Sequence, residues 1–262
     1  MEIPSTLCSN LYDFAFCPEP CYDRLVDLAD PEDWGLNNRI LKNYLSFSFS
    51  RAVFLTERDA EQESPSNLPL VFDDGRCLFN TGLYTRRYEN IYGLFEPNTK
   101  PDARQHWFLK GFFKESDPVL VAFEYLPCRV HFAEDPSELV FDYRLPIRSN
   151  IDHILGDEEN LTRIPTSLMG EDNSLLLRRA FEGAVAESAR RAAANYTLAV
   201  PQFYGGRIQL LLPLCLTSDK PELALTIQRE DGFYAARTCL TFEMAYNNAR
   251  LICRPETSWI KR

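Results

Sequence analysis

The stretch NYTLAVPQFYGGRIQLLLPLCL, residues 195 to 216, contains two β-like runs joined by Gly205-Gly206. Paired glycines favour a two-residue hairpin turn, because both central positions can adopt a positive φ without a steric cost. Five of the last seven residues are leucine, which predicts that the second strand is buried on both faces. Pro201 and Pro213 cannot donate to a strand ladder, so we expect them at an edge, a bulge or an unpaired position.

Four polar residues interrupt this apolar hairpin: Gln202, Tyr204, Arg207 and Gln209. A buried polar group without a partner costs about 1–3 kcal/mol, so each of them requires a hydrogen bond. Two interpretations are open. Either these side chains bond to neighbouring backbone and water, or they line a pocket and contact a ligand.

Periodicity and turn residues outside the hairpin predict a mixture of helices and strands. Asp231-Gly232 marks a second hairpin, and Asp30-Pro31 is expected to open a helical turn with Asp30 as its N-cap. The expected helices cover residues 22–29, 36–56, 150–155, 175–195 and 242–252. The expected strands cover 77–84, 88–95, 106–114, 119–125, 139–143, 197–204, 207–216, 223–229 and 233–241. This mixture predicts an α+β fold with a mainly antiparallel, twisted sheet and flanking helices.

The chain of 262 residues is expected to form an N-terminal arm, residues 1–24, and a single α+β domain, residues 25–262. Its net charge of −10 is unevenly distributed. Residues 1–173 carry 16 Lys and Arg against 30 Asp and Glu, whereas residues 174–262 carry 12 against 8. The basic C-terminal part is either ordinary solvated surface or the part that meets an anionic ligand.

Cysteine usage and hydropathy predict a cytoplasmic protein. The eight cysteines have no framework spacing and no secretory signal precedes them, so we expect reduced thiols. No apolar run reaches the ~18 residues of a membrane span. Cys17 and Cys21 are the one close pair, and because no second pair has ligand spacing, structural zinc is not expected. No residue pattern identifies a cofactor, a protein partner or an oligomeric state.

Motifs that specify a reaction are absent from the sequence: it contains no phosphate loop, GxGxxG, GxSxG elbow or HExxH. If the protein is an enzyme, we expect phosphoester or phosphoryl chemistry on RNA or a nucleotide, with His153 or Asp142 as acid or base. The competing interpretation is that His153 is an ordinary structural histidine.

Polar residues recur at helical spacing near the C-terminus, where Glu243, Asn247, Arg250 and Arg254 are expected to share one face. Two arginines on one stripe suit bidentate recognition of phosphate, although a salt-bridged structural face fits the same pattern. Asn80 is similar in kind, because it lies inside an apolar strand next to a glycine, either in a bulge or in a pocket wall.

Several of these stretches together resemble the family catalogued as domain of unknown function 3825. The resemblance covers about residues 25 to 260 and rests on CLFNTGL and IYGLFEPN (77–98), LVFDYR and IDHIL (139–155), residues 195–216, and MAYNNARLICRPETSW (244–259). Relatives often lie beside cold-shock-like and other RNA-binding modules, so the resemblance implies work on or near RNA. It implies no catalytic residue.

The sequence therefore favours an RNA- or nucleotide-binding protein whose polar side chains converge on one cleft. Arg207, Arg250 and Arg254 would hold phosphate, Tyr204 or Tyr246 would stack on a base, and four amides would read polar edges: Asn80, Gln202, Gln209 and Asn247. The alternative is a non-catalytic interaction module in which the polar stripe is a buried structural network.

Overall fold

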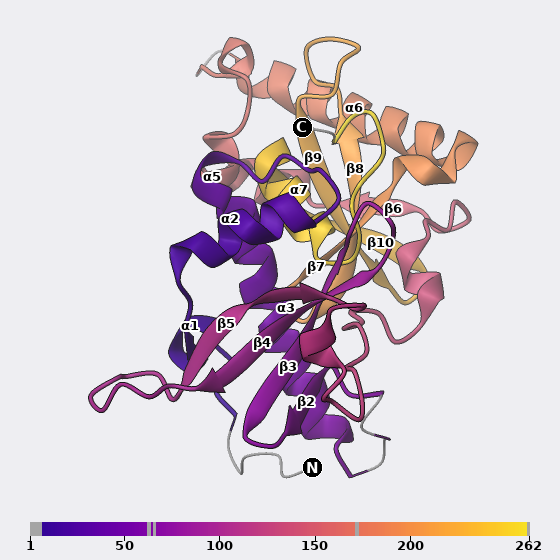
Figure 1. The fold of residues 1–262 in the computed structure, drawn as a ribbon. Helices are drawn as coiled ribbons and strands as arrows, with labels where there is room; N and C mark the ends of the chain where they lie inside the picture. The colour runs from indigo at the N-terminus through magenta and orange to yellow at the C-terminus, as the bar shows by residue number, and fades with distance from the viewer. Residues whose placement is uncertain (1–6, 62–63, 65–66, 171–172, 261–262) are drawn as a thin grey trace. The chain divides into compact units, whose positions relative to one another are not determined.

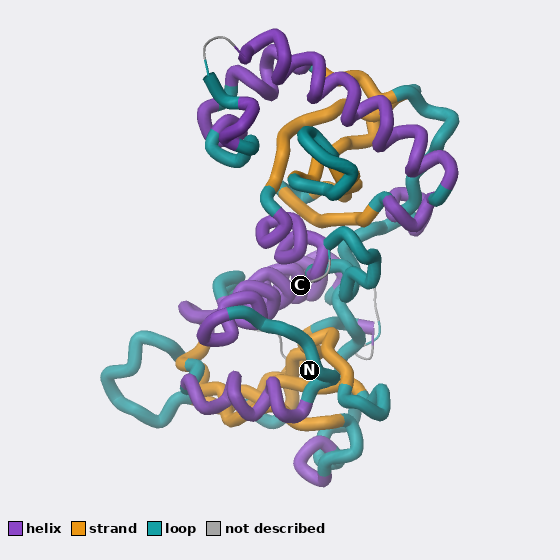
Figure 2. Tube along the Cα trace, turned by 90° about the horizontal axis from the view of Figure 1, so that it is seen from above, coloured by secondary structure: helices purple, strands orange, loops and turns teal. Residues whose placement is uncertain are grey.

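The computed structural model describes residues 7–61, 64, 67–170 and 173–260. The chain divides into two compact units, Met1–His131 and Phe132–Arg262. Each unit contains one five-stranded sheet with helices beside it (Figures 1 and 2). The α+β class and the mainly antiparallel pairing predicted from the sequence are confirmed.

The first unit has the sheet order β1-β5-β4-β3-β2, in which only the short β1–β5 pair is parallel. Its elements are α1 (Leu11–Phe14), β1 (Ala15–Phe16), α2 (Glu19–Leu28), η1 (Leu36–Asn38), α3 (Arg39–Asp59), β2 (Leu70–Asp73), β3 (Arg76–Tyr84), β4 (Asn90–Pro97), β5 (Trp107–Lys114) and η3 (Pro118–Leu120).

Helix α3 supplies the core of this unit, and its pattern shows why residues 36–56 form a helix rather than a strand. Leu41, Leu45 and Ala52 are buried at spacings of four and seven residues along one face. Phe49 lies between them, with its ring centroid 5.4 Å from that of Phe79 on β3. Burial of this stripe against the sheet stabilises α3 more than helix propensity does.

The second unit has the order β6-β10-β9-β8-β7, with a parallel β6–β10 pair at one edge. Its elements are η4 (Pro136–Leu139), β6 (Ile147–Ser149), α4 (Ile151–Gly156), α5 (Glu158–Leu161), η5 (Thr166–Leu168), α6 (Ser174–Ala194), η7 (Tyr196–Leu198), β7 (Val200–Tyr204), β8 (Arg207–Leu214), β9 (Leu223–Glu230), β10 (Phe233–Leu240) and α7 (Phe242–Arg250).

The predicted Gly-Gly hairpin joins β7 and β8. Gly205 and Gly206 both have positive φ, +58° and +79°, and Tyr204 pairs with Arg207 across the turn. Pro201 lies on the edge strand β7, and Pro213 lies two residues past the end of the β7 ladder. Neither proline therefore interrupts a hydrogen bond between β7 and β8.

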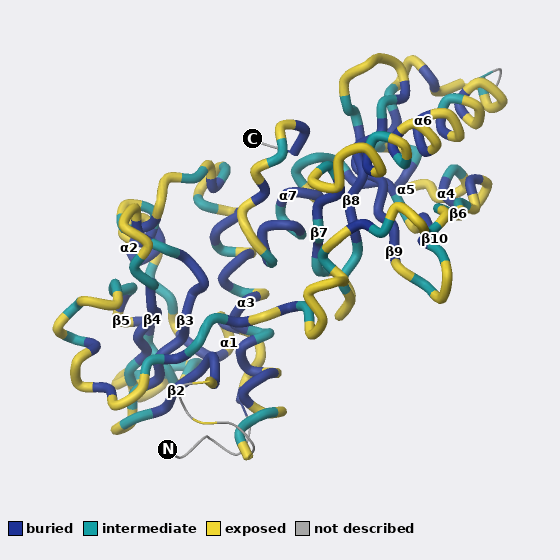
Figure 3. The backbone as a smooth tube through the Cα atoms, turned by 90° about the vertical axis from the view of Figure 1, so that its right-hand side faces the viewer, coloured by how far each residue is buried: buried dark blue, intermediate teal, exposed yellow. Residues whose placement is uncertain are grey.

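The two faces of the second sheet bury different sets of side chains. One face joins β8, β9 and β10 to α6 in the main core of the unit, which includes Leu212, Leu225 and Phe181. Figure 3 shows α6 with short buried segments between longer exposed ones, so that each turn has a buried side, next to strands that are mostly buried. On the other face, α7 covers only an apolar portion around Val200, Leu211 and their neighbours. The remainder of that face carries mainly polar side chains, among them Gln202, Gln209 and Gln228.

Three local predictions were wrong. Residues 119–125 do not form a strand, because Asp117 caps the 3₁₀ turn η3 that starts at Pro118. Residues 139–143 are not a strand either: they follow η4, which Asp135 caps in the same way. Asp30 caps no helix; its backbone N–H instead donates to the carbonyl of Tyr84.

The predicted N-terminal arm, residues 1–24, contains α1, β1 and the start of α2, and its first six residues lie outside the described part of the chain. The single domain expected over residues 25–262 stays a prediction. In the structure that range includes most of the first unit and all of the second.

Candidate ligand-binding face of the second sheet

A row of side-chain amides crosses the polar part of this sheet face. Asn248 Nδ2 on α7 donates to Gln202 Oε1 at 3.1 Å, and Gln202 Nε2 donates to Gln209 Oε1 at 2.8 Å. Gln209 Nε2 lies 3.5 Å from Gln228 Oε1 on β9, and Gln228 Nε2 donates to Glu230 Oε1 at 3.1 Å. We call this set of five residues the amide chain.

The direction of the amide chain follows from its last member. A carboxylate can only accept, so Gln228 must turn its N–H₂ group toward Glu230, and each amide upstream must then donate in the same sense. Aligned hydrogen bonds of this kind polarise and strengthen one another. Arg237 also donates to Glu230, so the chain ends on a paired charge.

A pocket of about 570 Å³ adjoins the amide chain at the β6–β10 edge. The paired register explains its position: Arg148 on β6 lies beside Ala235 on β10, and Ala235 lies beside Gln228 on β9. The pocket is lined by Arg148, Ser149, Asn150, His153, Ala235, Ala236 and Arg237.

The pocket carries cations that are only partly neutralised. The guanidinium of Arg148 lies 4.3 Å from the ring centroid of Phe233, and within the described ranges it forms no ion pair. The His153 side chain likewise has no hydrogen-bond partner among the residues that the structure describes; only its backbone N–H is bonded, to the Asn150 side chain at 3.2 Å. Arg237 shares its charge with Glu230. A negatively charged group would therefore find in this pocket a guanidinium that has no ion pair among the residues the structure describes.

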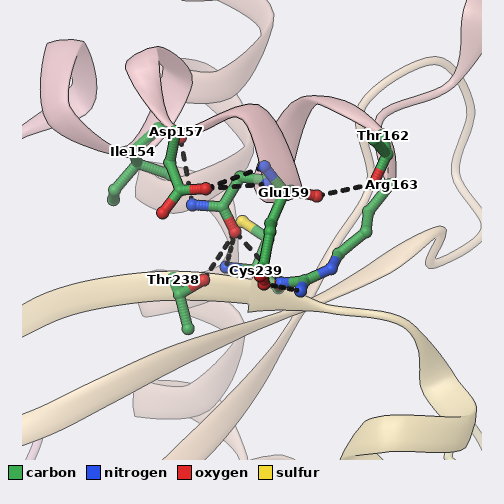
Figure 4. Close-up of polar contacts among 8 residues, drawn as sticks. Ile154, Asp157, Glu159, Thr162, Arg163, Thr238 and Cys239 are labelled. Carbon is green, nitrogen blue, oxygen red and sulfur yellow. Dashed lines mark hydrogen bonds and ion pairs between the residues drawn. The ribbon is translucent and has the colours of Figure 1, made fainter.

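Asn160 fixes the wall of the pocket by joining the α4–α5 segment to β10. Its side chain is almost wholly buried; Oδ1 accepts from Thr238 Oγ1 at 2.5 Å and from Cys239 N at 3.2 Å, while Nδ2 donates to the carbonyl of Ile154 at 3.0 Å. Arg163 donates to the same Oδ1 and to the Cys239 carbonyl (Figure 4). This network holds α4, and therefore His153, in place against β10.

The two residues suggested for acid–base chemistry differ in their surroundings. His153 lines the pocket. Asp142 instead binds Arg144 through both carboxylate oxygens, at 2.8 and 2.7 Å. These bonds lower the pKa of Asp142 to about 2, so its carboxylate is ionised and weakly basic at neutral pH. The catalytic role of either residue stays a prediction.

The hairpin residues named from the sequence fall into two groups. Gln202 and Gln209 belong to the amide chain and bond to each other. Tyr204, which is 64% exposed, and Arg207 lie at the hairpin turn and point to the same face as the amide chain, since alternate residues of a strand share a face. Of the four, Tyr204 and Arg207 are exposed, Gln209 is half-buried and Gln202 is buried.

The predicted stripe on the last helix is divided by the end of α7 at Arg250. Tyr246 and Arg250 are buried, with 4% and 6% exposure, whereas Arg254 is exposed beyond the helix. Asn247 Nδ2 donates to the carbonyl of Glu243 at 3.0 Å, and its buried Oδ1 has no partner among the described residues. Ligand binding by this stripe stays a prediction.

Asn80 lies in the first unit, at the predicted bulge of β3. Its Nδ2 donates to the carbonyl of Pro127 at 3.0 Å, and its Oδ1 accepts from the backbone N–H of Gly82 at 2.9 Å. The β3–β4 register shifts between Asn80 and Tyr84, as expected for a bulge with internal bonds. Both polar ends of this side chain are thus already used inside the fold.

Sequence reasoning gave no site role to Arg148, Ser149, Asn150, Phe233 or Arg237. Arg148-Ser149-Asn150 immediately precedes the IDHIL segment, so its position beside a family motif was visible. Phe233 and Arg237 read as ordinary strand residues. Only the parallel β6–β10 pairing, which joins residues 87 positions apart (Ala235 and Arg148), brings them together.

Comparison with known proteins gives one match. The family described as Domain of unknown function (DUF3825) matches residues 25–259, which include most of the first unit and nearly all of the second. The chain belongs to this family. No curated protein and no solved structure matches this DUF3825 chain. Because the family description names no activity, the function has to be argued from the site itself.

The described residues contain neither a candidate membrane span nor a candidate metal site. No helix among them has the length and apolar character required to cross a bilayer. In the same residues no group of three or more His, Cys, Asp and Glu side chains is arranged to hold a metal ion. The eight cysteines are all free thiols.

Proposed function

We propose that this DUF3825 protein binds RNA or a nucleotide, with the phosphate in the β6–β10 pocket and a base against the neighbouring aromatic side chain. The observation that supports this proposal is the guanidinium of Arg148, which has no ion pair in the described structure, borders the pocket and lies over the Phe233 ring. Guanidinium groups bind phosphate through paired hydrogen bonds, and bases stack on aromatic rings and on guanidinium planes.

The rest of the face suits a single strand better than a duplex. Tyr204 and Arg207 lie at the β7–β8 turn, and Glu230 and Phe233 lie at the β9–β10 turn, at the same end of the sheet. The outermost of these positions are separated by three strand spacings, about 14 Å. A strand of RNA crossing that distance would meet an aromatic ring at each end and an arginine near each ring.

For Gln202 and Gln209, the amide chain favours the alternative interpretation, in which these residues form a structural network rather than a ligand site. Since Gln202 and Gln209 already bond to each other and to their neighbours, they are suited to stiffening the sheet rather than to reading a base. We therefore assign the ligand to the pocket and to the exposed turn residues, and a structural role to the amide chain.

The test is a calorimetric titration of the whole protein with uridine and adenosine monophosphates at several salt concentrations. Arg148→Ala and Arg237→Ala should each weaken binding about tenfold or more, because a hydrogen bond to a charged group contributes about 1.5–3 kcal/mol. Arg179→Ala is the matched control: Arg179 is an exposed arginine on α6 and forms no ion pair in the described part of the chain. Wild-type affinity in both pocket variants would contradict the proposal.

Two further variants test whether the amide chain and the last helix contribute to ligand binding in addition to the pocket. Gln209→Leu should lower the free energy of unfolding while leaving nucleotide affinity unchanged if the amide chain is structural. The double variant Arg250→Ala, Arg254→Ala should keep its affinity provided that it folds. Loss of binding with the fold intact would move the phosphate site to the C-terminal face.

A further inference from the structure

The loop between β3 and β4 in the first unit exposes two arginines and a tyrosine side by side. Arg86, Arg87 and Tyr88 follow Thr85, and all three are exposed, Tyr88 to 83%. None of them takes part in the site proposed above. We refer to residues 85–89 as the β3–β4 loop.

The loop is held in one conformation from its base. Thr85 N donates to the Glu89 carbonyl at 2.9 Å, and Tyr88 N donates to the Thr85 carbonyl at 2.9 Å. The Thr85 hydroxyl also accepts from the N–H groups of Arg87 and Glu89. Thr85 itself is buried and forms a bridge to Ala29. A preformed loop loses little conformational entropy when it binds.

Tyr88 adopts a backbone conformation that favours glycine. Its φ is +62°, in the left-handed region, where a side chain costs free energy that glycine would not. The aromatic ring is not used inside the fold, because most of it is in solvent. Strain of this kind occurs preferentially at functional positions. The loop therefore keeps a ring outside the fold at the expense of stability.

The one acid of the loop does not neutralise its arginines. The Glu89 carboxylate accepts from Ser116 N at 3.1 Å and lies 3.5 Å from Lys114 Nζ, and the bonds from Ser116 lower its pKa. Among the described residues neither Arg86 nor Arg87 forms an ion pair. The two exposed arginines are neighbours in the chain and carry like charges, so a bound anion would be attracted by both.

We infer that the β3–β4 loop is a second contact for single-stranded RNA, in which Arg86 and Arg87 bind consecutive phosphates and Tyr88 stacks on an unpaired base. Two arginines beside an aromatic ring suit a single nucleic-acid strand, because each base has a π-face on which a ring can stack and each phosphate linkage carries a negative charge. The inference extends the proposed function to the first unit, and it predicts that the loop contributes to binding of an oligonucleotide but not of a mononucleotide.

The test is a fluorescence anisotropy titration of the whole protein with a labelled, unstructured 12-nucleotide RNA across salt, alongside uridine monophosphate. Arg86→Ala, Arg87→Ala should weaken oligonucleotide binding about tenfold or more and reduce the salt slope by about 1.4, which corresponds to two phosphate contacts on a single strand. Affinity for the mononucleotide should not change. The control is the double variant Arg179→Ala, Arg190→Ala, which removes the same charge from exposed positions of α6.

The variant Tyr88→Gly distinguishes the contribution of the aromatic ring to binding from its effect on stability. Glycine adopts a positive φ without the strain that a tyrosine has there, so this variant should unfold at a higher temperature than the wild type. It should also bind the oligonucleotide about fivefold or more weakly, because the ring is missing. Unchanged affinity in Tyr88→Gly and in the double arginine variant would overturn the inference, as would an equal loss in the α6 control.

The two proposals fail differently. If Arg148→Ala weakens binding of both ligands and the loop variants bind like wild type, the loop inference is wrong and the pocket stands. If the loop variants alone weaken oligonucleotide binding, the loop stands and the pocket is wrong. A wild-type protein that binds neither ligand overturns both.

Discussion

Asn160 shows at the scale of one residue how a buried amide can hold two segments together. Its two polar atoms serve Ile154, Thr238, Cys239 and Arg163, which lie up to 79 positions away in the chain. Nothing in the sequence around it, DEENLTR, distinguishes this asparagine from a solvated one. Its importance follows from tertiary position, because removing it leaves several buried groups without partners at once.

We predict that Asn160→Ala lowers the free energy of unfolding by about 2–4 kcal/mol, since buried donors and acceptors lose their partner. Urea denaturation followed by circular dichroism measures this. Glu158→Ala, at an exposed position of the same short helix, should change stability by less than about 0.5 kcal/mol. Similar values for the two variants would refute the role given to the network in Figure 4.

Asp142 allows a pH prediction with a definite sign. Arg144 and its backbone N–H lower the pKa of Asp142 in the fold to about 2, below the value of about 3.9 in an unfolded chain. A depressed folded pKa means that the pair stabilises the fold above about pH 4 and that this contribution is lost as the pH falls toward 2.

The difference in unfolding free energy between wild type and Asp142→Asn should therefore be constant above about pH 5 and should shrink between pH 4 and 2. Urea titrations at a series of pH values measure it. A difference that does not change over that interval would show that Arg144 is not the cause.

At the scale of elements, the β7–β8 hairpin follows from two glycines and needs no tertiary argument. Gly206 has a φ of +79°, and a Cβ added there would meet no heavy atom within 4 Å. Gly183, in the middle of α6, has equally open surroundings and no positive φ. The two positions differ only in backbone conformation, which makes them a matched pair.

Gly206→Ala should destabilise the protein by about 1 kcal/mol, because alanine is strained in the left-handed region. Gly183→Ala should stabilise it by about 0.5–1 kcal/mol, because alanine is the better helix former. Thermal unfolding should shift in opposite directions. A change of unfolding temperature with the same sign in both variants would mean that the left-handed conformation of Gly206 does not determine how much alanine destabilises the protein.

Elements without such local determinants were predicted poorly. Residues 119–125 and 139–143 have strand-like composition, but Asp117 and Asp135 cap short 3₁₀ turns that overlap the first residues of each range. The capping bonds could have been read from neighbouring residues. Whether another strand lies alongside, in contrast, depends on parts of the chain far away in sequence. A strand requires a partner ladder, which composition cannot supply.

At the scale of the whole molecule, the charge boundary near residue 173 and the structural boundary at His131 do not coincide. The acidic part of the sequence therefore includes the whole first unit and the pocket-forming segment 132–173 of the second. What matters for an anion is the local pairing of each guanidinium rather than the regional balance, because screening limits exposed charges to about 8–10 Å. Arg148 lies in the acidic part and still has no ion pair among the described residues.

The sequence alone determined the class of this DUF3825 protein, its two Gly-containing hairpins, the long helices α3 and α6, and its family, because periodicity and turn chemistry act between near neighbours. Only the tertiary structure decided that Gln209 on β8 bonds to Gln228 on β9, and that Arg148, His153 and Arg237 line one pocket. These groups become neighbours through strand register, and register depends on pairing between segments far apart in the chain.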